Sequence, residues 1–348
     1  MRKSFKVVLD CDDVLFQCNE ASITKLNSEE GTNYTINDIT DWGFLGNDLD
    51  KRLSFFTDPE FMENLPIYEG AKEFVKKLSK KAEIFIMTNV APNIAGIRIN
   101  SIIKNFPEIN PANIIIGGRK DLLKADIMLD DNMMNLEKAC CSFPVLMRRP
   151  WNYNQTGVLS ITNYDEFLKL VDIVKDNQNK DENYSAVVLI GPSGSNKNEI
   201  ADKLVEIGMV RIKPYSTKEN GNYTTVKKEA FYEMMSQKDF FETSSYAGNL
   251  FGTKKKDIET VIKSGKKPVL VLDINGAIAF KNEFNSLNVF VNVGKDKCIK
   301  SILRSDYSEE EKIHRILSID SELKNEELCD LTITDESQII KIMEEIAA

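Results

Sequence analysis

Three apolar runs in the first half of the sequence end in oxygen-bearing side chains. VVLD ends at Asp10, two residues before Asp12; IFIMT ends at Thr88; and IMLDD ends at Asp130 and Asp131. Parallel strands finish at one edge of their sheet, where ligands bind, so we expect these side chains to meet in space. Crowded carboxylates repel one another unless a cation lies among them, and oxygen ligands of this kind suit Mg²⁺. A single DxD after a strand is usually a turn or a helix cap, but three coinciding strand ends favour a magnesium site.

A second candidate site lies at the start of the other half. Residues 186–190 form an apolar run that leads into GPSGSNKN, residues 191–198, and then into the helix-like segment IADKLVEIG. A strand, a glycine-bearing loop and a helix N-terminus together form a cradle of backbone N–H groups for phosphate. In the usual pattern, GxxxxGK(S/T), Asn196 here replaces the second glycine and Asn198 replaces the hydroxyl residue that binds Mg²⁺. Asparagine tolerates positive φ, so we expect the loop to close, whereas the metal contact loses its usual ligand.

The elements that must position these residues alternate between apolar runs and amphipathic segments. Continuous Val, Ile and Leu runs between helical periods indicate parallel strands buried on both faces, so each half is predicted to be an α/β sandwich. We expect strands at residues 5–9, 84–87, 127–129 and 144–147 in the first half, and at 186–190, 268–272, 289–293 and 331–333 in the second. A helix is predicted at 164–174, with Asn163 and Glu166 as its capping box.

Chain length predicts more than one domain. At 348 residues and 42% hydrophobic content, the chain exceeds the usual size of a single hydrophobic core. The run DNQNKDEN at 176–183 has no apolar residue and is the best linker candidate. We therefore expect a domain at 1–175, a linker at 176–184 and a second domain at 185–348.

Charge and cysteine usage narrow the classes of partner. A formal net charge of −9 and a pI near 5.1 argue against stable binding to nucleic acid or to an anionic membrane, because binding to either requires clustered Lys and Arg. Small phosphorylated ligands need only local positive charge. The six cysteines form no CxxC pair, so we expect reduced thiols. With no targeting segment at the N-terminus and no apolar run of about 18 residues, we expect a cytoplasmic protein.

The carboxylate segments also resemble a known family. Asp10-Cys11-Asp12-Asp13-Val14-Leu15 resembles the first motif of the haloacid dehalogenase superfamily. Thr88, Lys120 and Asp130-Asp131 resemble the second, third and fourth motifs of that superfamily, in the same order. Within the superfamily, the sequence is most similar to the 5′(3′)-deoxyribonucleotidases, through FFTDPEFMENLPIYEG at 55–70, KDLLKADIMLDD at 120–131 and RPWN at 149–152. The resemblance covers about residues 4–175 and implies a Rossmann-like domain with a small helical cap at about 17–68.

The resemblance implies a role for each motif residue, and the chemistry suits the side chains. Asp10 would attack phosphorus, while Asp12 would protonate the leaving nucleoside oxygen and then activate water to hydrolyse the aspartyl phosphate. Mg²⁺ would be held by Asp10, the carbonyl of Asp12, and one or both of Asp130 and Asp131. Thr88 and Lys120 would hold the phosphoryl oxygens. Lys124 is a rival for the lysine role, but the ten-residue distance from Lys120 to Asp130 matches the family.

Aromatic residues are frequent in the segment that corresponds to the cap. Rings in such a cap can stack on a base and exclude water, and Phe16, Trp42 and Phe44 are the candidates for contact with the substrate. A cap also needs a core of its own, so most of its rings are expected to fill that core.

The second half resembles guanylate kinase from Ser185 to the C-terminus. The matching segments are GPSGSNK at 191–197, STK at 216–218, GNYTTVKKEAFYEM at 221–234, FFETSSYAGNLFGT at 240–253, 271–274 and 304–315. The resemblance implies a phosphate loop that includes Gly191, Ser193, Gly194, Ser195 and Lys197, with Lys197 on the donor phosphates of ATP or GTP. Tyr223 and Thr253 would bind the acceptor phosphate and Glu242 the acceptor base. Arg304 and Arg315 would clamp the transferring phosphoryl group.

Departures from this family concentrate on the acceptor side. The segment after Ser216-Thr217 is shortened to Lys218-Glu219-Asn220, which leaves one cation where the family has two arginines. A phosphate-binding tyrosine is replaced by Phe251, and an acidic base-binding position is replaced by Asn275. The guanylate kinase fold therefore transfers to this chain more securely than the activity does.

Three functions from different classes follow. The first is a bifunctional enzyme that joins a Mg²⁺-dependent nucleoside monophosphate phosphatase to a divergent nucleoside monophosphate kinase. The second keeps the phosphatase and makes the second half a non-catalytic nucleotide sensor, which Asn196 and Asn198 favour. The third is an end-healing phosphatase and kinase acting on nucleic acid, which the acidic pI and the guanylate-kinase-like acceptor region disfavour. The sequence leaves the base, the sugar and the oligomeric state open.

Overall fold

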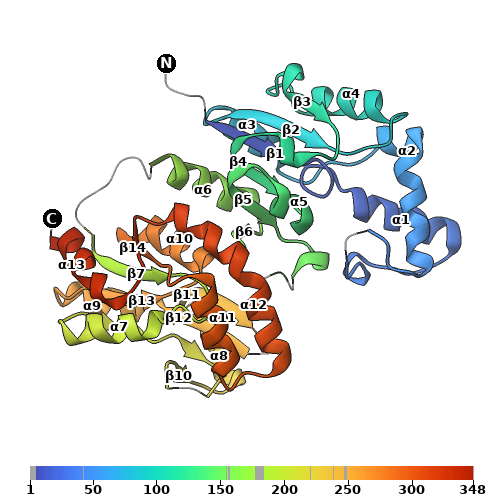
Figure 1. The fold of residues 1–348 in the computed structure, drawn as a ribbon. Helices are drawn as coiled ribbons and strands as arrows, with labels where there is room; N and C mark the ends of the chain where they lie inside the picture. The colour runs from blue at the N-terminus through green and yellow to red at the C-terminus, as the bar shows by residue number, and fades with distance from the viewer. Residues whose placement is uncertain are drawn as a thin grey trace. The chain divides into compact units, whose positions relative to one another are not determined.

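The structure is a computed structural model that describes residues 5–41, 43–153, 155, 157–176, 184–219, 221–237, 239–246 and 249–347 (Figure 1). It divides into two compact units, Met1–Lys175 and Asp176–Ala348. Trp42 and residues 177–183 of the expected linker lie outside the described residues. Within the described ranges, no helix has both the length and the apolar character needed to cross a membrane.

The first unit is built on a six-stranded parallel sheet with the strand order β3-β2-β1-β4-β5-β6. The strands are β1 (Lys6–Leu9), β2 (Glu83–Thr88), β3 (Ile114–Ile116), β4 (Ala125–Asp130), β5 (Cys141–Met147) and β6 (Ser160–Ile161). β1 and β4 are almost wholly buried, as their continuous apolar runs predict for strands covered on both faces. The prediction of a parallel α/β fold is confirmed for this half.

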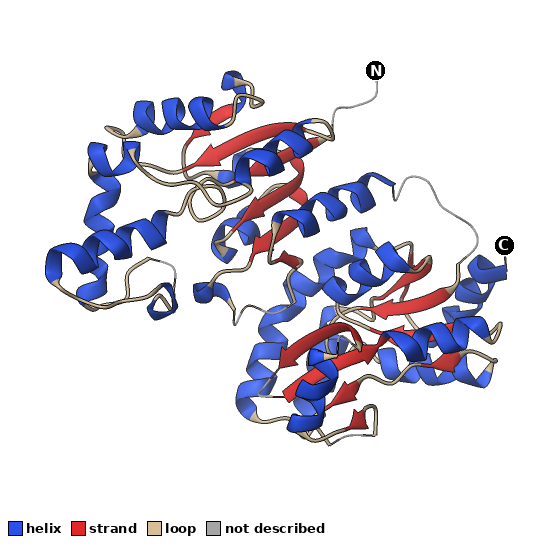
Figure 2. Ribbon diagram, turned by 180° about the vertical axis from the view of Figure 1, so that it is seen from behind, coloured by secondary structure: helices blue, strands red, loops and turns tan. Residues whose placement is uncertain are grey.

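Helices flank the strands of this sheet, as Figure 2 shows in blue. They are α3 (Ala71–Ser79), α4 (Ala95–Asn105), α5 (Met133–Lys138) and α6 (Tyr164–Asp176), with short 3₁₀ helices η3 (Pro111–Asn113), η4 (Lys120–Leu122) and η5 (Pro150–Asn152). α3 shows why such helices form, because Ala71, Phe74, Val75 and Leu78 fall on one buried face at helical spacing. At α6, Asn163 accepts from the N–H of Glu166, but the Glu166 carboxylate accepts from the N–H of Thr162, so the capping box is shifted by one residue.

A helical insert separates β1 from β2. It contains α1 (Cys18–Glu30), η1 (Ile36–Asp38), η2 (Asp48–Thr57) and α2 (Pro59–Glu63). Asn47 and Asp58 cap η2 and α2 by accepting from backbone N–H groups. The insert has its own core, made of Ile23, Leu26, Ile39, Leu49, Phe55 and Trp151. Trp151 comes from η5, so the insert packs on the chain that follows β5.

The second unit combines two sheets. Five parallel strands follow the order β15-β14-β7-β13-β8, and four strands form a second sheet in the order β10-β9-β12-β11. The first sheet contains β7 (Ala186–Ile190), β8 (Val210–Arg211), β13 (Pro268–Val271), β14 (Ser286–Val291) and β15 (Leu331–Ile333); the second contains β9 (Tyr215–Ser216), β10 (Thr224–Thr225), β11 (Phe240–Tyr246) and β12 (Asn249–Lys254). The parallel sheet confirms the prediction for this half. The sequence interpretation did not include the second sheet, in which β11 and β12 are antiparallel.

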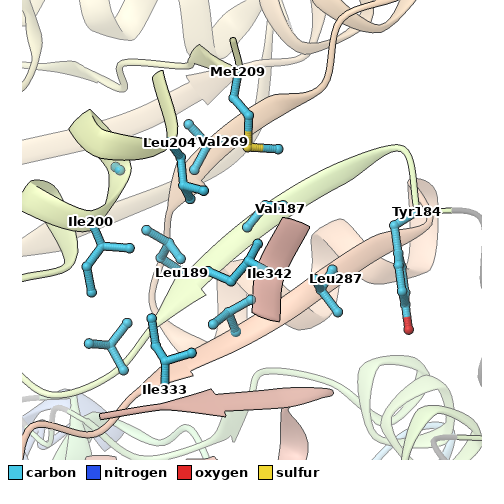
Figure 3. Packing of buried hydrophobic residues seen from close by; sticks show 13 residues of the cluster. Tyr184, Val187, Leu189, Ile200, Leu204, Met209, Val269, Leu287, Ile333 and Ile342 are labelled. Atoms are coloured by element: carbon cyan, nitrogen blue, oxygen red, sulfur yellow. The ribbon is translucent and has the colours of Figure 1, made fainter. Parts of the chain in front are cut away.

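Seven helices are described in the second unit: α7 (Lys197–Glu206), α8 (Lys228–Ser236), α9 (Lys255–Lys263), α10 (Ile274–Glu283), α11 (Lys295–Arg304), α12 (Glu309–Leu323) and α13 (Ile339–Ala347), with 3₁₀ helices η6 (Lys324–Leu328) and η7 (Glu336–Gln338). Figure 3 shows the core between α7, α13 and the parallel sheet. Val187 and Leu189 of β7 meet Ile200 and Leu204 of α7, all almost fully buried. This packing fixes the strand and the helix that flank the phosphate loop.

Candidate functional site

The strand order of the first unit brings its motif residues together. β1 lies between β2 and β4, and Leu9 is in register with Ile86 on one side and Leu129 on the other. The N–H of Asp10 continues this pairing by donating to the Leu129 carbonyl at 2.9 Å. The residues that end β1, β2 and β4 therefore emerge at the same edge of the sheet.

Three of these residues form a buried carboxylate cluster. Oxygen atoms of Asp10, Asp130 and Asp131 all lie within 4.8 Å of one another. Burial raises the pKa of Asp10 to about 7, although the Lys120 charge opposes the shift. Burial, followed by the charge of Asp130, also raises the pKa of Asp131. Anions that burial and mutual repulsion disfavour, and that offer only oxygen atoms, are a fitting ligand set for Mg²⁺.

Lys120 is the cation that the protein itself places in this cluster. Its Nζ lies 2.7 Å from an Asp10 oxygen and 2.5 Å from an Asp130 oxygen, and the side chain is 4% exposed. Burial alone would lower the pKa of Lys120, but the charges of Asp10 and Asp130 raise it. Lys124, the rival in the sequence interpretation, is exposed.

Asp12 faces a different partner. Its Oδ1 accepts from Arg98 Nη2 at 2.5 Å and from Cys18 Sγ at 2.9 Å. Arg98 comes from α4, is almost fully buried, and lies over the Phe16 ring at 4.8 Å from the centroid. Asp12 itself stays partly exposed. This pair fixes the side chain of Asp12 next to the cluster while leaving it accessible to a ligand.

The Thr88 hydroxyl is ready for a ligand. Thr88 ends β2 at the same edge, and its side chain is fully buried. Within the described part of the chain, its Oγ1 finds no hydrogen-bond partner. A buried hydroxyl without a partner carries a free-energy cost that a bound phosphoryl oxygen would remove.

The segment after β5 supplies contacts that the sequence interpretation did not assign. Trp151 Nε1 donates to Asp131 Oδ2 at 2.9 Å, and Asn152 Nδ2 donates to the Asp131 carbonyl at 2.8 Å. From α5, which precedes β5, Asn135 Nδ2 lies 3.2 Å from both oxygens of Asp130. The sequence interpretation used residues 149–152 only as a match to the family. Their position after the strand expected at 144–147 could have indicated that they lie at the edge of the sheet where ligands bind.

A buried network joins the loop that follows β1 to the helical insert. Asp13 has a left-handed backbone, φ 53°, and its carboxylate accepts from the N–H and Nδ2 of Asn19 at 3.0 and 2.6 Å. Asn19 Oδ1 in turn accepts from Arg52 Nε of η2 at 3.3 Å. Burial raises the pKa of Asp13 to about 7. Arg149 Nε donates to the Asp13 carbonyl at 2.7 Å, so this loop is held from both sides.

The candidate aromatic residues of the cap occupy different environments. Phe16 is fully buried, with its face toward Arg98 and its ring edge-to-face with Phe106 at 5.8 Å. Phe44 is 76% exposed. Trp42 is outside the described residues. Contact between these rings and a substrate stays a prediction.

The second unit has a closed phosphate loop. Gly191 and Gly194 have φ of 146° and 78°, and a Cβ on either would lie 2.6 Å from a backbone carbonyl oxygen, of Val291 and Cys298 respectively. Asn196 has φ 63°, in the left-handed region. The prediction that asparagine can close the loop in place of glycine is confirmed.

Side chains around the loop supply and balance charge. Lys197 Nζ donates to the carbonyls of Gly191 and Pro192 at 2.6 and 2.7 Å, and burial lowers its pKa to about 8. Arg315 Nη1 donates to Ser193 Oγ at 2.9 Å, so α12 brings an arginine to the loop. The N–H of Ser193 donates to the Glu322 carboxylate at 2.9 Å, an acidic contact that the sequence interpretation missed. Ser195 is fully buried inside the loop.

The expected acceptor residues lie on the second sheet and beside it. Glu242 and Thr253 are partners across β11 and β12, with Thr253 Oγ1 donating to Glu242 at 2.8 Å. Burial, followed by the charge of Asp273, raises the pKa of Glu242 to about 7. The Tyr223 ring packs edge-to-face on Phe251 at 5.2 Å.

The two arginines expected at the transferring group differ in their surroundings. Arg304 ends α11 and is exposed. Arg315 lies over the Tyr307 ring at 4.2 Å and pairs with Glu311. Of the two, Arg315 contacts the loop, through its hydrogen bond to Ser193 Oγ.

Comparison with known proteins divides the chain at the same place. Residues 3–178 match the family model described as "5' nucleotidase, deoxy (Pyrimidine), cytosolic type C protein", and residues 183–348 match the model described as "Guanylate kinase". A 5'(3')-deoxyribonucleotidase of Bacillus subtilis is 26% identical over 167 residues, which is 46% of this chain and 94% of that protein. A guanylate kinase of Fusobacterium nucleatum is 28% identical over 147 residues, 40% of this chain and 77% of that protein. A guanylate kinase of Clostridium perfringens is 32% identical over 113 residues, 30% of this chain and 52% of that protein.

Proposed function

Because the chain belongs to the cytosolic type C 5'-nucleotidase family through residues 3–178, with a guanylate kinase domain fused behind it, we propose that its first half hydrolyses (deoxy)nucleoside monophosphates with Mg²⁺ through an aspartyl phosphate on Asp10. The observation that carries the proposal is the buried cluster of Asp10, Asp130 and Asp131 with Lys120 between two of its members. The Bacillus subtilis relative, which matches this chain over 94% of its own length, is a nucleotidase. This match supports nucleoside monophosphates as the substrate class.

The chemistry divides between Asp10 and Asp12. An Asp10 carboxylate oxygen attacks phosphorus, the bond from phosphorus to the nucleoside oxygen breaks, and Asp12 gives that oxygen a proton. In the second step Asp12 takes a proton from water, the water oxygen attacks phosphorus, and the bond to Asp10 breaks to release phosphate. The contacts support this division, because Lys120 fixes Asp10 in the interior while Arg98 and Cys18 hold the more exposed Asp12.

Mg²⁺ fits the ligand set of this site. Asp10, Asp130 and Asp131 would hold it together with the carbonyl of Asp12, while Trp151 and Asn135 orient two of the carboxylates. When bound, the ion neutralises charge on the transferring phosphoryl group. Thr88 and Lys120 hold phosphoryl oxygens by hydrogen bonds, and the free hydroxyl of Thr88 supports its part in this.

For the second half we propose nucleotide binding at the phosphate loop, with residues 191–197 on the donor phosphates. Loop closure at Asn196 and the position of Arg315 against Ser193 support binding. Phosphoryl transfer is the second candidate function, which the Glu242 and Thr253 pair favours. A sensor without turnover is the alternative, which Phe251 and the single cation Lys218 favour. An end-healing role is disfavoured by the net charge of −9.

The test is phosphate release from a panel of ribo- and deoxyribonucleoside monophosphates, with Mg²⁺ and with EDTA. Asp10→Asn is expected to abolish release. Asp121→Asn is the matched control, since Asp121 carries the same charge but forms a surface ion pair with Arg119. Parallel reactions with ATP, followed by chromatography, would reveal diphosphate made by the second half. If no monophosphate is hydrolysed, or if Asp10→Asn retains the wild-type rate, the proposal for the first half fails.

A further inference from the structure

One position beside the phosphate loop carries an amide, hydrogen-bonded to an arginine, where the usual pattern has a metal-binding hydroxyl. In the GxxxxGK(S/T) pattern, the residue after the lysine provides the hydroxyl oxygen that binds Mg²⁺. That residue is Asn198, the second residue of α7. Its Oδ1 accepts a hydrogen bond from Arg211 Nη2 at 2.5 Å.

Arg211 is held firmly in this place. It ends β8, the strand next to β13 in the parallel sheet, and its side chain is only 12% exposed. Its Nη1 forms an ion pair with Asp202, one turn beyond Asn198 on α7, and Nη2 also lies 3.4 Å from Asn222 Oδ1. The guanidinium therefore has partners on two sides, and one of them is the oxygen at the metal position.

This arrangement does not fit Mg²⁺. The ion requires oxygen ligands at about 2.0–2.1 Å in near-octahedral geometry. At Asn198 the oxygen is already engaged by a positive group at 2.5 Å, so a divalent cation bound to the same atom would meet that charge at close range. Breaking the contact would leave the guanidinium without its shortest neutral acceptor.

We propose that Arg211 is the resident cation of this site, and that the second half binds the phosphates of a nucleoside triphosphate without a divalent metal ion. The inference rests on the proposed nucleotide binding of the second half. A guanidinium is always charged and presents planar N–H donors that match phosphate oxygens, so it can supply the positive charge that Mg²⁺ supplies elsewhere.

The other charges around the loop are consistent with such a ligand. Lys197 and Arg315 face the loop from α7 and α12, and Lys197 is mostly protonated at neutral pH. Each of these cations has a carboxylate nearby: Glu322, which accepts from the N–H of Ser193 at the loop, Glu311 beside Arg315 and Asp202 beside Arg211. The three cations therefore offer N–H donors to an anionic ligand without an excess of positive charge at the site.

A plain surface ion pair is the alternative, because Arg211 also pairs with the exposed Asp202. In that case Arg211 would stabilise α7 slightly and have no effect on a ligand. Lys203 provides a matched comparison, since it lies on the same helix and pairs with Glu336. The two explanations of the Arg211 contact therefore predict different affinities for the ligand, whereas stability does not separate them.

The experiment is calorimetric titration of the full chain with ATP, once with EDTA and once with Mg²⁺. The variants are Arg211→Gln, the charge control Lys203→Gln, and Lys197→Ala, which removes the loop lysine and so identifies binding at this site. We expect the wild-type Kd in EDTA to lie within about threefold of the Kd in Mg²⁺, and Arg211→Gln to weaken binding in EDTA by roughly tenfold or more. Lys203→Gln should bind like the wild type.

A double variant guards against loss of the fold as the explanation. Arg211→Gln combined with Asn198→Ser restores the usual hydroxyl ligand and removes the cation, so its ATP binding should become dependent on Mg²⁺. Wild-type binding that requires Mg²⁺, or equal Kd values for Arg211→Gln and Lys203→Gln, would overturn the inference and leave nucleotide binding intact. Absence of ATP binding under both conditions, or binding that Lys197→Ala does not change, would instead refute the proposed function of the second half.

Discussion

Replacing Lys120 by methionine should expose how the carboxylate cluster is balanced. Lys120 lies between Asp10 and Asp130, whose side chains are 9% and 0% exposed. Methionine keeps the length of the side chain and removes the charge, so the buried carboxyl groups of Asp10, Asp130 and Asp131 would lose their internal cation. Removing one partner of a buried ion pair costs about 3–5 kcal/mol.

The expected change in melting temperature follows from this free energy. Each kcal/mol shifts the midpoint of a domain of about 150–250 residues by roughly 2–4 °C. In EDTA, the first half of Lys120→Met should therefore melt roughly 6–20 °C below the wild type. Mg²⁺ should restore part of the difference, because the ion replaces the missing positive charge among the same oxygen atoms. The increase in stability on adding Mg²⁺ should be larger for the variant than for the wild type.

Tryptophan fluorescence can follow this unfolding in the full chain. The sequence contains two tryptophans, Trp42 and Trp151, and both belong to the first half. Trp151 is buried and donates to Asp131, so its emission reports directly on the cluster. Lys124→Met is the control, since Lys124 is exposed and undergoes the same substitution. If the two variants melted at the same temperature in EDTA, the balance of charge described here would be wrong.

Three further predictions concern individual contacts. Trp151→Phe removes the donor to Asp131 and should raise the Mg²⁺ concentration for half-maximal phosphate release about 10–100-fold, measured by Mg²⁺ titration, with little change if the contact has no role. Arg98→Met frees Asp12 and should lower kcat about 100-fold with a smaller effect on KM, while Arg98→Lys should recover part of the loss; unchanged kinetics would exclude a positioning role. Because burial lowers the pKa of Lys197 from 10.5 to about 8, the unfolded chain binds the proton more tightly, so the stability of the second half should rise between pH 8 and 10.5. As the pH rises over this range, the affinity of the second half for ATP should fall, because Lys197 loses its charge. ATP titrations at several pH values should show this fall for the wild type and not for Lys197→Arg.

The ends of the strands were predictable because burial on both faces leaves a plain mark in the sequence. Asp10, Thr88 and Asp130 each follow an uninterrupted apolar run, and a parallel sheet necessarily gathers such ends. The same reasoning placed Lys197 in a loop before a helix expected from Ile200, whereas α7 already begins at Lys197. Asn196 was predictable from its chemistry, because few residues other than glycine adopt positive φ.

Contacts between distant segments left no comparable mark. Arg98 pairs with Asp12 across 86 residues, and in the sequence it is one polar residue in an amphipathic helix. Arg211 and Glu322 likewise reach the phosphate loop only through the fold. The sequence interpretation did not predict the second sheet, because β9 and β10 have two residues each and β10 is exposed. Strands of this kind leave no apolar run in the sequence.

The family assignments from the motifs are confirmed for both halves, and the parallel sheets agree with the predicted fold class. The motif order carried this information because it fixes which strand ends must meet. The residues that contact the substrate were less predictable, because the aromatic residues of the cap follow no fixed spacing. Phe16 was a candidate for substrate contact because the cap segment is rich in aromatic residues; its ring packs on Arg98 and Phe106, and contact with a substrate stays a prediction.

Trapping of the covalent intermediate tests the central claim most directly. Full-length protein is mixed with the preferred nucleoside monophosphate and Mg²⁺, quenched within the first turnover and treated with borohydride, which reduces an acyl phosphate to an alcohol. Mass spectrometry of the peptide that contains Asp10 should then show homoserine at position 10, only when substrate and Mg²⁺ are both present. Phosphate released at the full rate with an unmodified Asp10, or reduction at another carboxylate, would contradict the assignment of Asp10 as the nucleophile.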